Sequence, residues 1–509
     1  MDVQRVFAGD IGASGGKCFV GTFDQNGFEI SELHRFTHEV TSLFIENRTG
    51  KINERMYWDE LLIYQNIIKG LQCFRREISP TLESIGIDTW GTDGVFVTED
   101  GDLLGRVYCY RDHRLDTMIE EVQTRIDAHR LYEITGIHFW PFNLSGQLHW
   151  FFTNRKELYQ DGCSFLPMPT LFYFCLGGVK KVDSTWASVS QLMDTRKKCW
   201  SCEVLEKLDI PELAMPGIVS PGTVMGQLSV PLAQWLDLNS AKLTAVGSHD
   251  TASAFAAAPV EKREEALIIS SGTWSLIGRL IPEPITTPEA MSANISNEGG
   301  IGDIRFLKNC MGTWIVQELR RIWKVTDGKE LTWDEITSLV ERASAFTAFI
   351  DPDHRMFYNP PNMERAIAEF CKKTGQDTTR DRGTILRIVY ESLAMKYRRV
   401  NEEISAVIGK PSSVIHIVGG GSKNELLNQF TADATGLPVV AGPDEATAVG
   451  NIMVQATGLG IISNLDVSIP LIRQAFSIVS YHPKESVSWR KQHERFQNIA
   501  LKMQKGNSS

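Results

Sequence analysis

Two Gly- and Ser-rich turns, each set between two apolar runs, are the segments of this chain best suited to bind an anion. The first lies at residues 10–17 (DIGASGGK) and the second at residues 270–275 (SSGTWS). An apolar run, a small-residue turn and a second apolar run predict a β-hairpin. Backbone N–H groups at such turns can surround a phosphate group. Two of them in similar halves predict a nucleotide held between two lobes, although either turn alone is also compatible with an ordinary tight turn.

Asp10 ends the first predicted strand, beside the first turn. A carboxylate at this place can bind Mg²⁺ next to a nucleotide's phosphates, or it can stabilise its own turn. The neighbouring Gly16-Lys17 is not a Walker A motif, because no Gly stands five residues before Gly16 and Cys18 follows the lysine. No G-x-G-x-x-G follows the first strand either. The sequence therefore disfavours P-loop and dinucleotide-binding chemistry.

His249 and Asp250 follow a predicted strand at residues 244–248. Ligands of α/β sheets bind at this end of the strands. An aspartate there can accept the proton of a hydroxyl group whose oxygen attacks phosphorus. The alternative is that Asp250 caps a helix beginning at Thr251.

A second polar strand end carries Asp88, Trp90 and Asp93. An aromatic ring beside carboxylates suits a sugar, because the ring can stack on the sugar and the carboxylates can accept hydrogen bonds from its hydroxyl groups. A core tryptophan flanked by turn aspartates explains the same residues.

A third glycine-rich segment joins a predicted strand to a helix near Asn424. It reads GGGS at residues 419–422. Glycines let a nucleotide lie close to the backbone, and a helix N-terminus favours phosphate, but three glycines also make a plain flexible turn. The small-residue helix at residues 445–451 is expected to pack closely against a sheet beside this segment.

The composition and net charge of the chain disfavour some classes of protein. The chain has 509 residues, a net charge of −10 and nine cysteines. An acidic chain is poorly suited to nucleic acid as its main partner. No apolar run approaches the roughly 18 residues that span a bilayer, and no secretory signal is visible. Scattered cysteines, Cys199 and Cys202 included, indicate reduced thiols in a cytoplasmic protein.

Alternating strands and helices predict an α/β chain. Helices are expected at residues 58–78, 114–134, 314–323 and 384–408 and after residue 485, with a disordered end. A charged turn after Pro259 marks the best boundary, giving domains 1–258 and 259–509 with a C-terminal helical tail.

Taken together and in order, these motifs resemble the FGGY family of carbohydrate kinases over nearly the whole chain. The shared motifs are DIGASGGK at 10–17, HRF at 34–36, DTWGTD at 88–93, YRDHR at 110–114, PFN at 141–143, HDTASA at 249–254, SGTWS at 271–275, NCMGTWIVQ at 309–317, GGGSKN at 419–424 and GPDEATAVGN at 442–451. The resemblance implies two actin-like, ribonuclease-H-like α/β domains with an interdomain cleft. It also implies an ATP- and Mg²⁺-dependent kinase of a small ketose.

Site residues carried over by this resemblance fall into four groups. Asp250 would be the catalytic base, and Asp10 would lie near Mg²⁺. The sugar would contact Gly91, His249, Thr251 and Asn309, and ATP would contact Ala13, Ser14, Gly15, Gly16, Lys17, Thr273, Gln317, Gly420 and Asn424. The expected partners are a ketose and ATP, without nucleic acid or membrane, in a monomer or homodimer. A catalytically silent sugar- or nucleotide-binding protein on the same scaffold is the alternative from another class.

Four departures from the family pattern leave the exact sugar open. Lys17 stands where relatives often have Arg, so the planar fork of a guanidinium is lost. Gly15 replaces a Ser, and Thr92 replaces an apolar residue beside the sugar motif. The segment of residues 41–56 is longer than usual and could form part of the sugar-site rim or an oligomer contact.

Overall fold

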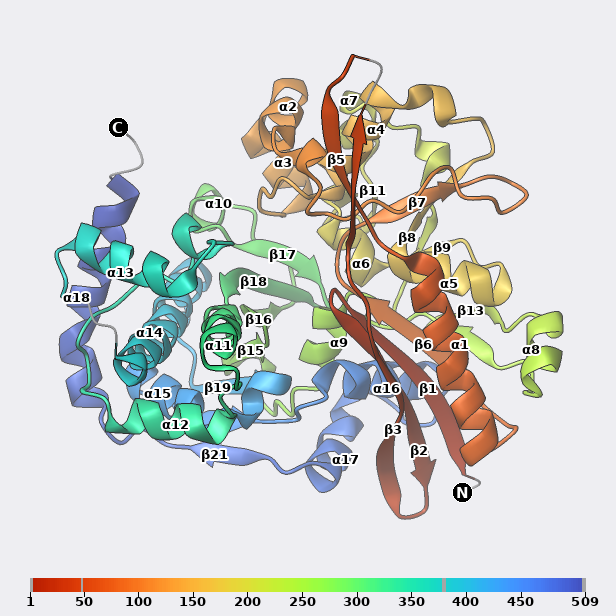
Figure 1. The fold of residues 1–509 in the computed structure, drawn as a ribbon. Coiled ribbons are helices and arrows are strands. Elements are labelled where there is room, and N and C mark those ends of the chain that lie inside the picture. Colours follow the sequence, from red (N-terminus) through yellow and green to blue (C-terminus); the bar gives the residue numbers. More distant parts are fainter. Residues whose placement is uncertain (1–2, 47–48, 378–380, 506–509) are drawn as a thin grey trace. The chain divides into compact units, whose positions relative to one another are not determined.

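The computed structural model describes residues 3–46, 49–377 and 381–505. The chain divides into two compact units. The first unit comprises Met1–Glu261, Leu280–Phe306 and Ala446–Phe476, and the second comprises Lys262–Arg279, Leu307–Glu445 and Ser477–Ser509. Each unit contains strands and helices in alternation, so the α/β class predicted from the sequence is confirmed (Figure 1). The division at residues 258 and 259 stays a prediction.

The first unit is built on a six-stranded sheet in the order β13-β14-β6-β1-β2-β3. Its strands are β1 (Gln4–Gly12), β2 (Gly15–Asp24), β3 (Gly27–Thr37), β6 (Ser84–Thr89), β13 (Val224–Gln227) and β14 (Lys242–Thr244). Strands β1, β2 and β3 form an antiparallel meander, whereas β6 runs parallel to β1. Parallel strands end at the same edge of a sheet, so β1 and β6 bring their polar ends together.

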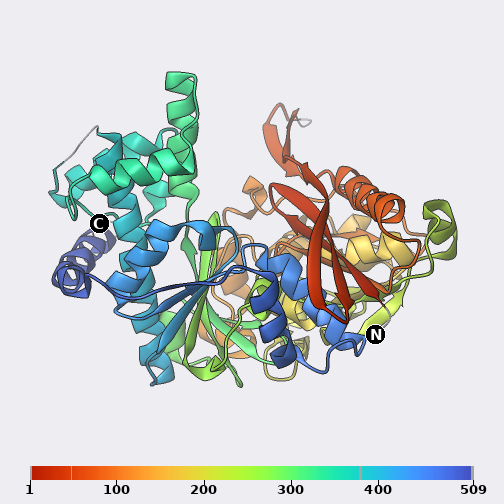
Figure 2. The ribbon, with the colours of Figure 1, turned by 90° about the horizontal axis from the view of Figure 1, so that it is seen from below.

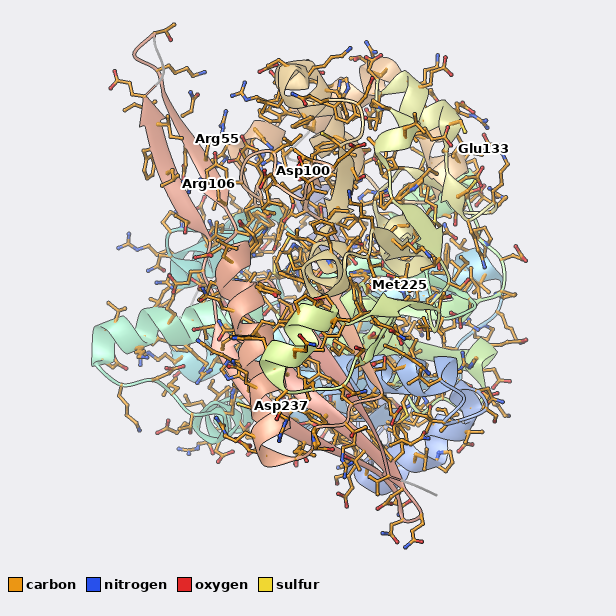
Figure 3. The ribbon with its side chains drawn as sticks, turned by 90° about the vertical axis from the view of Figure 1, so that its right-hand side faces the viewer. Arg55, Asp100, Arg106, Glu133, Met225 and Asp237 are labelled. Atoms are coloured by element: carbon orange, nitrogen blue, oxygen red, sulfur yellow. The ribbon has the colours of Figure 1, made fainter. Side chains whose placement is uncertain are left out.

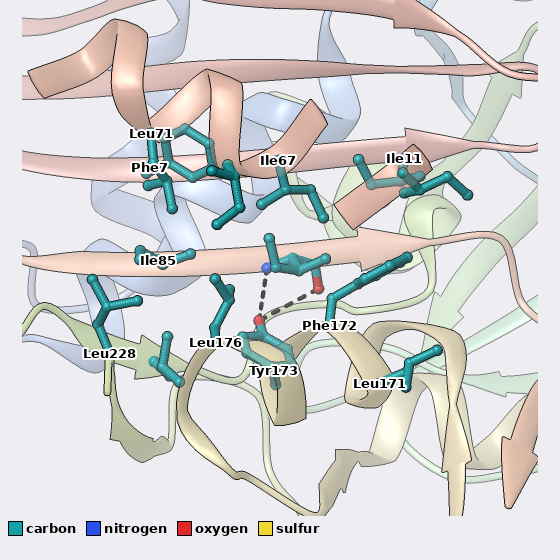
Figure 4. Packing of buried hydrophobic residues seen from close by; sticks show 14 of the residues in the cluster. Phe7, Ile11, Ile67, Leu71, Ile85, Leu171, Phe172, Tyr173, Leu176 and Leu228 are labelled. Atoms are coloured by element: carbon teal, nitrogen blue, oxygen red, sulfur yellow. Dashed lines mark hydrogen bonds between the residues drawn. The ribbon is translucent and has the colours of Figure 1, made fainter. Parts of the chain in front are cut away.

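A large apolar core fixes these strands. Phe7 and Ile85 of the sheet pack with Leu71 of α1 (Glu60–Glu77) and Leu176 of α5 (Met168–Gly177), and all four side chains are fully buried (Figure 4). Within this core the Tyr173 hydroxyl accepts the N–H of Ile87 at 2.7 Å. The bond satisfies a polar group inside an apolar cluster and ties α5 to β6.

Helix α16 (Ala446–Gly458) packs closely against α9 (Asp250–Ala256) and the first sheet, as its small residues predict. A Cβ on Gly450 would collide with the backbone of Ser253 in α9, and one on Gly86 in β6 would lie 2.5 Å from Asn451 Oδ1. The blue α16 lies beside the red strands of this sheet in both Figure 1 and Figure 2. A segment far along the chain thus completes the first unit.

A second sheet has seven strands in the order β17-β18-β16-β15-β19-β20-β21. They are β15 (Ala266–Ser271), β16 (Trp274–Ile281), β17 (Ser296–Gly299), β18 (Ile304–Met311), β19 (Val414–Val418), β20 (Val439–Ala441) and β21 (Val479–Tyr481). The second unit's helices are α11 (Trp314–Asp327), α12 (Trp333–Arg342), α13 (Met363–Thr374), α14 (Arg382–Ile408), α15 (Glu425–Thr435) and α18 (Ser486–Lys505). Tyr397 and Val400 of α14 are fully buried, as its apolar stripe predicts.

The first unit also carries smaller elements outside its main sheet. These are β4 (Thr41–Glu46), β5 (Ile52–Tyr57), β7 (Gly94–Val97), β8 (Ser164–Pro167), β9 (Lys181–Asp183), β10 (Met193–Asp194), β11 (Cys199–Trp200), β12 (Gly217–Val219), α2 (Met118–Arg125), α3 (Ala128–Thr135), α4 (Leu144–Asn154), α6 (Ser184–Val189), α7 (Cys202–Lys207), α8 (Val230–Leu236), α10 (Pro288–Ser292) and α17 (Ser468–Ala475). No helix in the described ranges is both long and apolar enough to cross a membrane.

The long segment at residues 41–56 forms the antiparallel hairpin β4–β5. At its base Arg55 lies 3.9 Å from Asp112, and Arg106 lies over the ring of Tyr57 (Figure 3). Toward its tip Phe44 and Ile52 are 71% and 64% exposed. A role as a site rim or an oligomer contact stays a prediction.

Predicted and observed elements agree at both hairpins and at the long helices. The segment 114–134 is helical but broken, because Ile126 is extended and the Asp127 side chain caps α3 by accepting the N–H of Arg130. The tail after residue 485 is helical as α18, and the predicted disordered end at residues 506–509 lies outside the described residues.

Candidate active site

The first Gly/Ser turn joins β1 to β2, with Asp10 opposite Lys17 in the register. The adjacent strand β3 crosses close to this turn. A Cβ on Gly15 would lie 2.6 Å from the Phe36 carbonyl oxygen, and one on Gly16 would lie 2.5 Å from the Phe36 ring. Because β3 passes so close, only glycine fits without strain at position 15, where this chain departs from the family pattern.

His38 supports the same turn and was missed in the sequence. Its side chain is almost fully buried, and its Nε2 lies 2.8 Å from the Gly12 carbonyl oxygen. Burial lowers the pKa of His38, which favours the neutral ring. A neutral ring that carries its proton on Nε2 donates to this carbonyl and fixes the end of β1. No motif in the sequence marks this contact across 26 positions.

Asp10 and Asp88 lie side by side on β1 and β6. Asp88 is fully buried and accepts a hydrogen bond from Asn451 Nδ2 at 2.6 Å, while its Oδ1 makes no hydrogen bond among the described residues. Burial, followed by the charge of Asp10, raises the pKa of Asp88 well above its usual range. The raised pKa favours the neutral form of Asp88, and both carboxyl groups lie close to the first Gly/Ser turn.

Asp93 has a structural role that the sequence left open. The side chain is fully buried and accepts hydrogen bonds from the indole N–H groups of Trp58 at 2.7 Å and Trp90 at 3.1 Å. The Gln147 amide also donates to it, at 2.9 Å. Burial raises the pKa of Asp93 to about 6, although these hydrogen bonds act to lower it. The structure thus favours the core-tryptophan interpretation of Trp90 and Asp93 over direct sugar binding.

Gly91, His249, Asp250 and Thr251 meet where β6 ends and α9 begins. Thr89 pairs with His249 in an isolated parallel bridge, and a Cβ on Gly91 would lie 2.7 Å from His249 Nε2. Glycine is therefore required at position 91 if the His249 ring is to keep its place. Four residues from two distant motifs form one polar cluster.

The Asp250 carboxylate is fixed by hydrogen bonds but is still accessible to solvent. Its Oδ1 accepts the N–H of Thr251 at 2.6 Å and the Thr251 hydroxyl at 3.1 Å, and the side chain is 31% exposed. His249 Nε2 lies 3.4 Å from the same oxygen. The helix α9 begins at Asp250 and its N-cap residue is His249, so Asp250 is not the cap of a helix beginning at Thr251 that the alternative interpretation predicted. A fixed, accessible carboxylate of this kind can accept a proton from a bound hydroxyl group.

Two buried charged residues behind His249 were also missed in the sequence. Arg305 and Glu298 are 0% and 5% exposed, and Arg305 Nη1 lies 3.1 Å from Glu298 Oε2. Burial acts to raise the pKa of Glu298, but the charge of Arg305 opposes it, and that pKa lies below its usual range. In the sequence, Arg305 stands as a charged residue in the largely apolar run of β18, whereas the polar run of β17 (SNEG) gives no such signal for Glu298.

In the second unit, the turn between β15 and β16 is locked to the start of α11. Thr313 donates to the Gly272 carbonyl oxygen from its N–H at 3.0 Å and from its hydroxyl at 2.8 Å. Gln317 Nε2 in turn lies 3.3 Å from Thr313 Oγ1. Thr273 and Gln317, both predicted to contact ATP, therefore belong to one rigid corner.

The glycine-rich segment after β19 lies against the same corner. A Cβ on Gly421 would collide with the Ser271 side chain, and Gly419 has a φ of +81°. Asn424 caps α15 by accepting the N–H of Leu427 at 3.0 Å, and its Nδ2 donates to the Tyr390 hydroxyl at 3.0 Å. Gly420 and Asn424 thus lie on the same side of the second unit as Ser271, at a helix N-terminus suited to a nucleotide.

Asn309 lies on β18 in the second unit, whereas the other residues expected to contact the sugar lie in the first. Its Oδ1 is buried and makes no hydrogen bond among the residues that the structure describes. The contact of Asn309 with a sugar stays a prediction.

Comparison with known proteins assigns both halves of the chain. The model of the FGGY carbohydrate kinase N-terminal domain matches residues 7–256, and that of the C-terminal domain matches residues 267–459. A rhamnulokinase of Bacteroides thetaiotaomicron is 36% identical over 97% of this chain and 99% of its own length. Rhamnulokinases of Pectobacterium carotovorum and Bacillus subtilis are 36% and 33% identical over 98% and 94% of this chain and 97% and 95% of their own lengths.

Solved structures share the fold at low sequence identity. A gluconate kinase and a xylulose kinase from Lactobacillus acidophilus superpose with TM-scores of 0.79 and 0.78, each at 16% identity over 99% or more of both chains. A Plasmodium falciparum glycerol kinase with ADP gives a TM-score of 0.78 at 16% identity over 98% of both chains. These likenesses confirm the predicted fold of two actin-like, sheet-containing α/β domains.

Proposed function

Because the chain belongs to the FGGY family of carbohydrate kinases and is an ATP-dependent sugar kinase, we propose that its acceptor is L-rhamnulose. The reaction would transfer the γ-phosphoryl group of ATP to the 1-hydroxyl group, giving L-rhamnulose 1-phosphate and ADP. The observation that carries this proposal is the near-full-length similarity to rhamnulokinases at 33–36% identity. The polar cluster around Asp250 supports it, since its residues can bind a hydroxyl group and accept a proton.

Asp250 is assigned the role of catalytic base. Because Thr251 holds Oδ1 through its N–H and hydroxyl groups, the second carboxylate oxygen is assigned as the proton acceptor. Proton removal by a positioned base accelerates such a step by about 10²–10⁴-fold. Gly91, His249, Thr251 and Asn309 would contact the sugar.

ATP is assigned to the glycine-rich turns. Backbone N–H groups of residues 13–17 would bind the phosphate groups, and Lys17 would add positive charge. In the second unit, the corner formed by Thr273, Gln317, Gly420 and Asn424 would bind the nucleotide. Such fixed donors stabilise the charge that develops during phosphoryl transfer.

Asp10 is the residue assigned to Mg²⁺. Mg²⁺ is bound through one or two carboxylates together with substrate phosphates and water. The pair of Asp10 with the buried Asp88, whose Oδ1 lacks a hydrogen-bond donor within the described ranges, fits a cation of this kind. When bound, Mg²⁺ would neutralise charge on the β- and γ-phosphates.

The proposal is tested by comparing acceptors. Coupled ADP release with Mg-ATP is measured for L-rhamnulose, L-fuculose, L-ribulose, D-xylulose and glycerol, and the phosphorylated carbon is located by NMR of the product. The proposal predicts the highest kcat/KM for L-rhamnulose and a 1-phosphate product. A higher kcat/KM for L-fuculose or for another ketose would overturn the substrate assignment in favour of the alternative, an L-fuculokinase or another ketose kinase of the FGGY family. Absence of turnover with every sugar would favour a silent binding protein.

A further inference from the structure

We propose that Arg305 holds His249 in the tautomer that carries its proton on Nε2, so that His249 acts as a hydrogen-bond donor beside Asp250. Arg305 and Glu298 would then be positioning residues of the reaction. The tautomer is argued from the structure alone, whereas its effect on turnover rests on the proposed kinase function.

The argument begins with the bond between Arg305 and His249. Arg305 Nη2 lies 3.1 Å from His249 Nδ1. A guanidinium group donates hydrogen bonds and cannot accept them. His249 Nδ1 must therefore be the acceptor and carry no proton. A neutral imidazole whose Nδ1 is bare carries its proton on Nε2.

Glu298 competes for the same ring nitrogen, because its Oε2 lies 3.4 Å from His249 Nδ1. A carboxylate at this place would favour a proton on Nδ1. Arg305 is closer to Nδ1, and its Nη1 lies 3.1 Å from the same Glu298 oxygen. Glu298 Oε2 forms no well-directed hydrogen bond within the described part of the chain. The geometry therefore makes Arg305 the hydrogen-bond partner of Nδ1, and Glu298 balances the charge of the guanidinium group.

Arg305 is well fixed for this role. Its side chain is fully buried, its Nε donates to the Gly299 carbonyl oxygen at 2.8 Å, and the guanidinium carbon lies 5.9 Å from the centre of the Phe255 ring. Phe255 belongs to α9, the helix that begins at Asp250. A guanidinium held on three sides cannot turn away from His249 without breaking these contacts.

The other ring nitrogen faces the cluster around Asp250. His249 Nε2 lies 3.4 Å from Asp250 Oδ1, on the side where Gly91 lacks a Cβ. An Nε2–H group there can donate to Asp250 or to a sugar oxygen. A bare Nε2 would instead face a carboxylate with its lone pair, which is unfavourable.

The tautomer is measured directly on full-length protein labelled with ¹⁵N-histidine. Nitrogen shifts and couplings to the ring protons distinguish protonated from bare nitrogens, and loss of one signal in His249→Gln assigns it. The proposal predicts a bare Nδ1 and a protonated Nε2 in the wild type. A proton on Nδ1 would overturn it, whichever sugar proves to be the substrate.

The variant Arg305→Met links this tautomer to Arg305, because methionine fills much of the same space but has no hydrogen-bond donor. It leaves Glu298 as the remaining partner of Nδ1. The tautomer is measured in variant protein that gives the wild-type near-ultraviolet circular dichroism. A mixture of tautomers or a protonated Nδ1 is expected there, and an unchanged bare Nδ1 would contradict the role of Arg305.

Kinetics test the donor at Nε2. The side-chain amide nitrogen of Gln can reach the position of Nε2, whereas that of Asn reaches the position of Nδ1. Loss of a buried hydrogen bond to a charged group lowers kcat/KM for the sugar by roughly 10–150-fold. His249→Gln is expected to lose less than tenfold and His249→Asn to lose this full amount, with KM for ATP unchanged. Equal losses in both variants would contradict the donor role.

Discussion

The contact between Gly91 and His249 gives a sharp prediction for the variant Gly91→Ala. The new Cβ would lie 2.7 Å from His249 Nε2, 2.9 Å from Cδ2 and 3.1 Å from Cε1, whereas ordinary contact begins at 3.4 Å. The ring must therefore move by about 0.7 Å, and Arg305 and Glu298 behind it leave little room. Overpacking of this kind costs about 1–3 kcal/mol of the free energy of unfolding.

The kinetic effect of Gly91→Ala follows from the same displacement. A shift approaching 1 Å in a positioned group can lower the rate about 10²-fold. We expect kcat/KM for the sugar to fall by roughly 10–100-fold, with a smaller change in KM for ATP, in the coupled ADP-release assay. Gly217→Ala is the control, because a Cβ there meets nothing within 4 Å and φ is not positive. Wild-type kcat/KM together with an unchanged melting temperature in Gly91→Ala would refute the packing argument.

Three further predictions concern two buried charged groups and the first Gly/Ser turn. Burial raises the pKa of Asp93 from 3.8 to about 6, so its folded state binds more protons than its unfolded state between these values, and stability falls as pH rises through this window. Asp93→Asn should remove up to roughly 3 kcal/mol of the fall in unfolding free energy between pH 4 and pH 7, measured by urea unfolding, and an equally large fall in the variant would contradict the assignment. Lys396 is 5% exposed and pairs with Asp351 at 3.1 Å and Asp353 at 2.7 Å. Lys396→Met should therefore lower the free energy of unfolding by about 3–5 kcal/mol, whereas Lys373→Met, which breaks an exposed pair with Glu369, should change it by less than about 1 kcal/mol; similar losses in the two would count against a buried ion pair. Gly15→Ser restores the residue of the family pattern but places a Cβ 2.6 Å from the Phe36 carbonyl oxygen. The KM for ATP should therefore rise several-fold. An unchanged KM would show that β3 can move to make room for the side chain.

The sequence predicted the fold well because its local signals agree with one another. Both hairpins follow from small residues between apolar runs, and α14 follows from its apolar stripe. The return of α16 to the first unit could not be predicted, since it depends on contacts such as Asn451 with Asp88 across 363 positions. The break between α2 and α3 was missed because the side-chain cap at Asp127 outweighs helix propensity there.

The candidate site was predictable only in part. Residue types and spacing alone left Asp250 between a base and a helix cap, and the family resemblance decided between them. The roles of His38, Glu298 and Arg305 could not be predicted, because each depends on a partner brought near by the fold and no motif marks it. Trp90 and Asp93 illustrate the opposite error. Their sequence pattern suits a sugar-binding site, but in the structure they form a buried hydrogen-bond network.

The central claim is that Asp250 removes the proton of the attacking hydroxyl group. Asp250→Asn is the most direct test, because the amide oxygen can still accept the N–H of Thr251 while the side chain can no longer take a proton. The account predicts that kcat for L-rhamnulose falls about 10²–10⁴-fold, while the sugar and Mg-ATP raise the melting temperature as they do in the wild type. A variant that binds both ligands and turns over within tenfold of the wild type would contradict it.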